Sequence, residues 1–140
     1  MIPKEFSCEG KGYSPSFHVS GIPEGTTCLA LIMDDPDAPR GTYTHWIFWN
    51  ASFRTAEFSS HALPENAVEG TNSAGETGYV GPCPPSGTHR YFFRAYALST
   101  SLDIKGDATV DKLQEAMRGK IIAEAELVGL YSKGEQSPEK

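Results

Sequence analysis

The sequence has little positive charge: it contains 12 Lys and Arg residues and 18 Asp and Glu residues, which gives a formal net charge of −6. No run of Lys or Arg exceeds two residues. A nucleic-acid-binding surface needs a dense positive field to displace counterions from phosphates, and an acidic membrane surface repels a chain of this charge. The charge balance therefore argues against nucleic acids and membrane surfaces as partners.

The sequence also lacks the usual signs of a disulfide framework, a zinc site or an export signal. The cysteines, Cys8, Cys28 and Cys83, are odd in number and form no CxxC pair, which excludes a fully paired disulfide framework and suggests no zinc site. The first residues, MIPKEFSCEG, lack the charged start and apolar run of a signal peptide. The longest apolar run, 29–33, is too short to span a bilayer. These absences predict a cytoplasmic protein without an integral membrane segment.

Glycine and proline are abundant, with 14 and 10 residues in a chain of 140. This composition favours many turns and hence β structure. The length suits one domain with one core. We expect that domain to occupy residues 1–133, followed by a polar, frayed tail over 134–140.

Hydrophobic patterning predicts mostly strands. Val110, Leu113 and Met117 recur at helical spacing and indicate a helix over 109–118. AEAEL, near the end of the chain, has good helix propensity, but alternation favours a strand there. Residues 64–88 are rich in Gly, Pro, Asn and Ser and indicate a long loop of the kind that often carries function. The fold class expected is an antiparallel β-sandwich with one or two short helices. Its predicted strands cover 27–34, 45–51, 89–98 and 121–128.

An acidic cluster, DDPDAP at 34–39, follows the first of these strands. Its carboxylates repel one another, so the folded chain must disperse or pair them. One interpretation is a turn in which Asp side chains cap backbone N–H groups. The other is that Asp35 faces a pocket and orients a histidine. His45 opens the next strand, so the two residues could meet across neighbouring antiparallel strands and fix the imidazole tautomer.

The loop that leads into the strand at 89–98 is the second candidate region. Its prolines stiffen the backbone, and its glycines allow close approach to a ligand. Exposed backbone N–H groups in such a loop can bind an anion. The loop delivers His89 and Tyr91 onto one strand face, with Arg90 and Phe92 on the other. A rigid connection without a ligand is the alternative interpretation.

Taken together, these segments resemble the phosphatidylethanolamine-binding protein family, in particular its short microbial branch of Raf kinase inhibitor-like proteins. The resemblance rests on three motifs in order and two supporting segments, and covers nearly the whole chain. The motifs are DDPDAP at 34–39, HWIFWN at 45–50 and GYVGPCPPSGTHRYFFRAYAL at 78–98, supported by SPSFHVSGIPEG at 14–25 and AMRGKIIAEAELVGLY at 116–131.

The resemblance implies a β-sandwich with a larger and a smaller sheet, and a ligand pocket near one edge. It places Asp35 and His45 at the pocket base, and Asp37 in the adjacent turn with a structural role. The other residues it implies for ligand binding are Tyr43 at the mouth, Tyr79, Gly81 and Pro84 in the wall, and His89 and Tyr91 as polar groups.

The function expected is binding of a small phosphate-like or phospholipid-headgroup anion, as a sensor or an inhibitor-type regulator. Two histidines beside one aspartate predict binding that strengthens as the imidazoles become protonated. The sequence contains no Gly-x-Ser-x-Gly, P-loop or HExxH motif that would indicate an enzyme. It also implies no cofactor.

Two other functions stay open at this point. Asp35, His45 and His89 form a two-His, one-carboxylate set that could hold a metal ion in an enzyme, and Cys83 is a candidate nucleophile. The pocket rim could instead bind and inhibit a kinase or a protease. A homodimer is compatible with the family resemblance.

Overall fold

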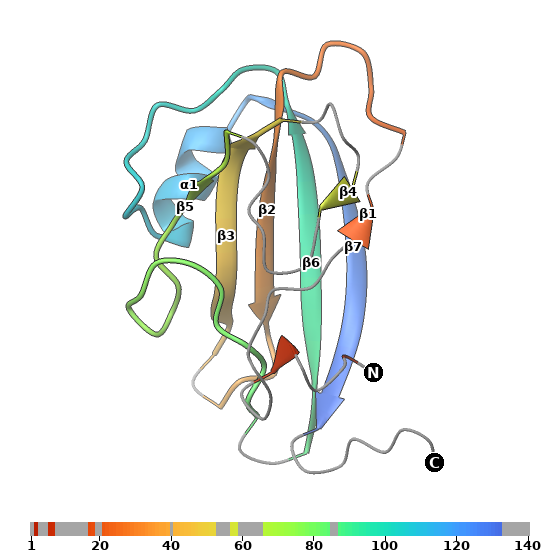
Figure 1. Cartoon of the computed structure of the whole chain (residues 1–140), viewed down its shortest axis with the longest axis vertical. Helices are drawn as coiled ribbons and strands as arrows, with labels where there is room; N and C mark the ends of the chain where they lie inside the picture. Colours follow the sequence, from red (N-terminus) through yellow and green to blue (C-terminus); the bar gives the residue numbers. More distant parts are fainter. Residues whose placement is uncertain are drawn as a thin grey trace.

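A computed structural model describes residues 2, 6–7, 17–18, 21–39, 41–52, 57–58, 66–84 and 87–132. Its main element is a five-stranded antiparallel sheet in the order β5-β3-β2-β6-β7 (Figure 1). A second sheet pairs β1 with β4. The strands are β1 (Phe17–His18), β2 (Cys28–Asp35), β3 (Tyr43–Ala51), β4 (Glu57–Phe58), β5 (Val68–Glu69), β6 (Thr88–Leu98) and β7 (Ile121–Ser132), and the helix is α1 (Val110–Met117).

These elements confirm the predicted fold class, which is mostly β and antiparallel with one short helix. The predicted strands correspond to β2, β3, β6 and β7, and the final segment is a strand rather than a helix. β7 continues four residues beyond the predicted end at 128. The short strands β1, β4 and β5 were not predicted, since two residues carry no periodicity. The predicted tail at 134–140 lies outside the described residues.

β2 is buried along its whole length because it lies in the middle of the large sheet, with β3 on one side and β6 on the other. Leu31 and Met33 face a core shared with Trp46 and Phe48. Ile32 faces the opposite core, where the helix packs. A strand covered on both faces is apolar at every position rather than at alternate ones, which explains the continuous apolar stretch in the sequence.

Helix α1 covers the second face of the sheet. Leu113 and Met117 are its buried residues, and they pack in the same core as Ile47 and Trp49 of β3. The helix begins at Val110, one residue after the predicted start at 109, and the side chain of Thr109 makes no capping hydrogen bond. Among the described residues, no helix has the length and apolar character needed to cross a membrane.

The connectivity of the sheet brings three strand ends together. Because β2 runs antiparallel to both β3 and β6, the end of β2 lies beside the starts of β3 and β6. Asp35 ends β2, while His45 and His89 lie near the starts of the other two strands. The fold therefore gathers the predicted polar residues at one end of the large sheet.

Gly70, which follows β5, offers a test of this packing. A Cβ atom there would lie 2.5 Å from the Ala108 carbonyl oxygen and 2.5 Å from Ile47 Cδ1. We expect Gly70→Ala to lower the free energy of unfolding by about 1–3 kcal/mol, because the core must shift to admit a methyl group. At Gly106 the atom nearest to an added Cβ would be Val68 Cγ1 at 3.4 Å. Gly106→Ala should therefore change the free energy of unfolding by less than about 0.5 kcal/mol. Urea denaturation of the two variants checks this, and equal losses would contradict the described packing.

Candidate ligand-binding pocket

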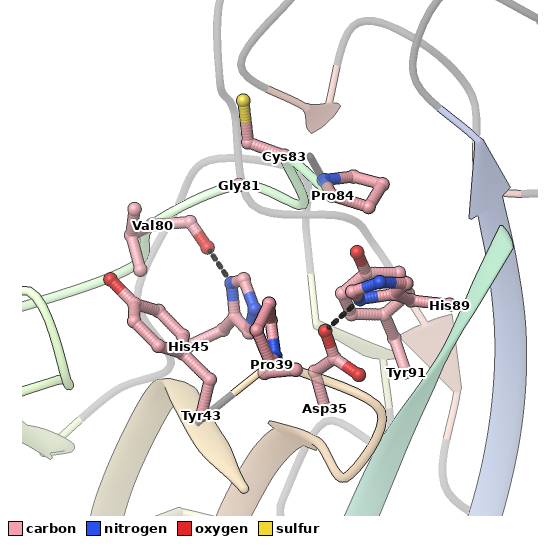
Figure 2. A pocket seen from close by; sticks show the side chains of 11 residues that line it. Asp35, Pro39, Tyr43, His45, Val80, Gly81, Cys83, Pro84, His89 and Tyr91 are labelled. Carbon is pink, nitrogen blue, oxygen red and sulfur yellow. Dashed lines mark hydrogen bonds and ion pairs between the residues drawn. The ribbon is translucent and has the colours of Figure 1, made fainter. Parts of the chain in front are cut away.

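A pocket of about 250 Å³ opens where the three strand ends meet. Its walls come from the acidic turn after β2, the start of β3, the loop before β6, and β6 itself (Figure 2). The lining residues are Asp35, Ala38, Pro39, Tyr43, His45, Val80, Gly81, Cys83, Pro84, His89 and Tyr91. The polar groups lie near the strand ends, and Pro84 and Cys83 lie across the cavity from them (Figure 2).

All the predicted ligand-binding residues line this pocket except Tyr79. The Tyr79 hydroxyl donates a hydrogen bond to the carbonyl oxygen of Phe6. Its ring packs edge-on against Trp46, with ring centroids 5.5 Å apart, and burial raises the pKa of the hydroxyl. Tyr79 therefore stands behind the pocket wall and supports it.

Asp35 uses both carboxylate oxygens. Oδ1 accepts the backbone N–H of Asp37 at 2.8 Å, which closes the turn. Oδ2 accepts the Nδ1–H of His89 at 2.6 Å, in a pair whose side chains are 4% and 10% exposed. The acidic cluster therefore fits both interpretations, the capped turn and the pocket carboxylate. The same Asp35 side chain caps the turn and orients a histidine. That histidine is His89 on β6, so the predicted Asp35–His45 pair was wrong.

His45 takes a different partner, the backbone of the loop before β6. Its Nδ1 lies 2.8 Å from the carbonyl oxygen of Val80, and the Val80 N–H donates to the His45 carbonyl oxygen at 2.9 Å. The imidazole is also held between the rings of Tyr43 and Tyr91, with centroids 4.8 and 5.3 Å away. Burial lowers the pKa of His45, although the Val80 carbonyl and the Asp35 charge oppose this shift. The structure therefore favours a neutral imidazole at this position.

The chain near the N-terminus braces the pocket wall. A Cβ atom on Gly81 would lie 2.7 Å from the Phe6 carbonyl oxygen and 2.8 Å from Ser7 Cα. Glycine at 81 lets the loop backbone pack directly on residues 6–7, where Tyr79 also makes its hydrogen bond. The loop is thus shaped by backbone contact with a distant part of the sequence.

The other two carboxylates of the acidic cluster also find partners on β6. Asp37 accepts hydrogen bonds from Nε and Nη2 of Arg90 at 2.9 and 2.8 Å, and from the Arg90 backbone N–H at 2.8 Å. These bonds lower the pKa of Asp37 to about 2. Asp34 pairs with Arg94 Nη1 at 2.5 Å on the opposite sheet face. One strand, β6, thus supplies a separate partner for each of the three clustered carboxylates, and Asp37 has a structural contact as predicted.

Comparison with known proteins places this chain in a family. The family model described as "Phosphatidylethanolamine-binding protein" matches residues 1–132. The chain belongs to the phosphatidylethanolamine-binding protein family. The resemblance inferred from the sequence motifs is therefore confirmed.

Relatives and solved structures agree with this membership. The chain is 44% identical over 138 residues to a UPF0098 protein of Methanothermobacter thermautotrophicus, covering 95% of this chain and 91% of the relative. A crystal structure of a putative phosphatidylethanolamine-binding protein homolog from Chlamydia trachomatis superposes with a TM-score of 0.90 at 45% identity, covering 94% of this chain and 89% of the other. For YbcL of E. coli, described as a member of the mammalian family, the TM-score is 0.83 at 34% identity, with 91% and 84% covered.

The metal-site hypothesis finds no support in the geometry of this family member. Among the described residues, no group of three or more His, Cys, Asp or Glu side chains could hold a metal ion. Both carboxylate oxygens of Asp35 are already engaged, by the Asp37 N–H and by the His89 Nδ1–H. The predicted set of Asp35, His45 and His89 therefore does not converge on one point as ligands would.

The cysteines differ from expectation. Cys83 is disulfide-bonded, so it has no thiol, and its prediction as a candidate nucleophile was wrong. Cys28 is free and buried, and burial raises the pKa of its thiol. Cys8 lies outside the described residues.

Sequence reasoning missed part of the pocket lining. Ala38 and Pro39 form one wall, and they belong to the acidic motif for which a turn was one interpretation. Val80 contributes a backbone carbonyl to His45. No side-chain pattern identifies that carbonyl, because its role depends on where the loop lies in space.

The depressed pKa of His45 predicts a dependence of stability on pH. The unfolded chain takes up a proton at His45 near the ordinary pKa of 6.5, whereas the folded chain does so only at lower pH. Below about pH 6.5 the unfolded state therefore binds more protons, and His45 should remove up to about 1.4 kcal/mol of stability per pH unit. His45→Asn keeps an N–H donor for Val80 and cannot titrate. Urea denaturation from pH 7.5 to 5 should show a smaller loss in the variant, and parallel curves would contradict the assignment.

Proposed function

We propose that the chain binds a small phosphate-like anion, free or as part of a phospholipid headgroup, in the pocket at the end of β2. The observation that carries this proposal is the preformed polar floor, in which buried Asp35 holds His89 by a 2.6 Å hydrogen bond. Ligand sites commonly combine an apolar wall with a few well-placed polar groups. Here the wall includes Pro39, Val80 and Pro84.

The floor can accommodate negative charge when His89 is protonated. The Asp35–His89 pair is then net neutral, and Nε2–H becomes a donor, since Nδ1 is occupied by Asp35. A charge-assisted hydrogen bond from an imidazolium to an anion is stronger than a neutral one. His45 is disfavoured as a second cation, because burial lowers its pKa. The strengthening of binding at low pH expected from the sequence is therefore assigned to His89.

We propose a binding or regulatory role rather than an enzymatic one. Membership of the family supports ligand binding in general. The described lining residues contain no serine, threonine or lysine, and Cys83 is disulfide-bonded, so none of these four nucleophile types is available beside His89 in this part of the chain. A kinase or protease partner and a homodimer stay predictions from the sequence.

Paired tyrosine variants on β6 test the site. Tyr91 lines the pocket, whereas Tyr96 lies on the opposite face in the core with α1. We expect Tyr91→Phe to weaken phosphate binding about two- to tenfold through loss of one neutral hydrogen bond, and Tyr96→Phe to leave it unchanged. Titration of phosphate and O-phosphorylethanolamine, followed by NMR at pH 5.5 and 7.5, measures both variants against the parent chain. Binding should be tighter at pH 5.5, and the absence of saturable binding at either pH would overturn the proposal.

A further inference from the structure

The imidazole of His45 presents a hydrogen-bond acceptor to the pocket. A carbonyl oxygen can only accept a hydrogen bond, so the contact of 2.8 Å with Val80 places the proton on Nδ1. In the neutral ring, Nε2 then carries a lone pair. Nε2 makes no hydrogen bond to any residue in the described part of the chain, and His45 lines the cavity (Figure 2).

The orientation of this ring is fixed by its surroundings. The reciprocal backbone bond from the Val80 N–H to the His45 carbonyl holds the two segments in register at 2.9 Å. Tyr43 and Tyr91 lie on either side of the imidazole, at 4.8 and 5.3 Å between ring centroids. Moving the proton from Nδ1 to Nε2 would place the lone pair of Nδ1 against the Val80 carbonyl oxygen. The acceptor is therefore a permanent feature of the pocket while His45 is neutral.

An acceptor at this position restricts which anion fits. An unprotonated ligand oxygen facing Nε2 would bring two lone pairs together and leave a buried acceptor unsatisfied, which is costly. A ligand hydroxyl there would instead donate to Nε2. Asp35 adds a negative charge nearby, so a singly charged ligand is repelled less than a doubly charged one.

Building on the proposed anion site, we propose that the pocket selects phosphomonoesters in their singly protonated form, with the ligand P–OH group donating to Nε2 of His45, and discriminates against phosphodiesters and sulfate. A phosphomonoester has a second pKa near 6, so a hydroxyl is present in mildly acidic solution. A phosphodiester anion has the same single charge and no hydroxyl. The headgroup phosphate of an intact phospholipid is a diester, so a free phosphomonoester is the ligand source that this geometry favours.

A pair of isomers isolates the ligand proton. Ethyl phosphate is a monoester and dimethyl phosphate is a diester, and both have the same atoms and the same charge as monoanions. The groups that face His45 are Asp35 from β2, His89 and Tyr91 from β6, and Tyr43 from its own strand. A change of charge on these groups acts on both monoanions. A neutral His89 also has a bare Nε2 that can accept from P–OH, and a variant of His45 separates the two rings. The ratio of the two affinities therefore reports on the P–OH group.

The test is calorimetric titration of the full chain with ethyl phosphate, dimethyl phosphate and sulfate at pH 5.5 and 8. We expect ethyl phosphate to bind about tenfold or more tightly than dimethyl phosphate at pH 5.5, with sulfate also weak. The ratio should fall at pH 8, where ethyl phosphate loses its proton. Equal affinity of the isomers at pH 5.5, or tighter binding of the diester, would overturn this inference and leave the anion site standing. Failure of all three to bind would overturn the anion site, and the inference with it.

A variant of His45 assigns the discrimination to its ring. His45→Asn can still donate an N–H to Val80 but lacks Nε2, so the two isomers should bind with similar affinity at pH 5.5. Tyr96→Phe, on the far face of β6, should keep the parent ratio. Amide NMR spectra establish that each variant is folded. A folded His45→Asn that retains the full preference for the monoester would overturn the role of Nε2.

Discussion

The buried carboxylate of Asp35 is the interaction around which the polar end of the sheet is arranged. It ends the central strand and is 3% exposed, and a buried charge is costly unless it is paired and hydrogen-bonded. Its two oxygens receive the Asp37 N–H and the His89 Nδ1–H. Since these donors come from the turn after β2 and from the start of β6, the carboxylate ties together two walls of the pocket.

The two pocket histidines are held in opposite ways, and this contrast defines the site. His89 donates to a carboxylate, whereas His45 donates to a neutral carbonyl in a buried position that disfavours charge. Groups with similar chemistry and different surroundings take different protonation roles. The pocket thus combines a histidine that is bound to a carboxylate with another whose neutral ring presents an acceptor.

Much of this arrangement can be predicted from sequence because it follows from periodicity. The alternation in β6 correctly places His89 and Tyr91 on the pocket face, opposite Arg90, and the apolar run in β2 reflects its central position. The partner of Asp35 could not be predicted in the same way. Both neighbouring strands bring a histidine to the end of β2, and only the three-dimensional register decides between His45 and His89.

The remaining differences have similar causes. Tyr79 lies in the pocket-wall loop but turns towards Phe6, a contact across 73 positions of sequence. The Val80 carbonyl is a backbone group without a residue-type signature. The disulfide at Cys83 depends on a spatial pairing that an odd number of cysteines does not specify. Local sequence identifies which residues are available, whereas long-range packing decides which of their atoms meet.

The tautomer of His45 is the most direct measurement of this account, because it reports the Val80 contact and the polarity of the pocket together. Long-range proton–nitrogen correlation spectra of the full chain at pH 7.5 distinguish a protonated ring nitrogen from a bare one. The structure requires the proton of His45 on Nδ1 and a bare Nε2. A proton on Nε2, or on both nitrogens, at this pH would contradict the account.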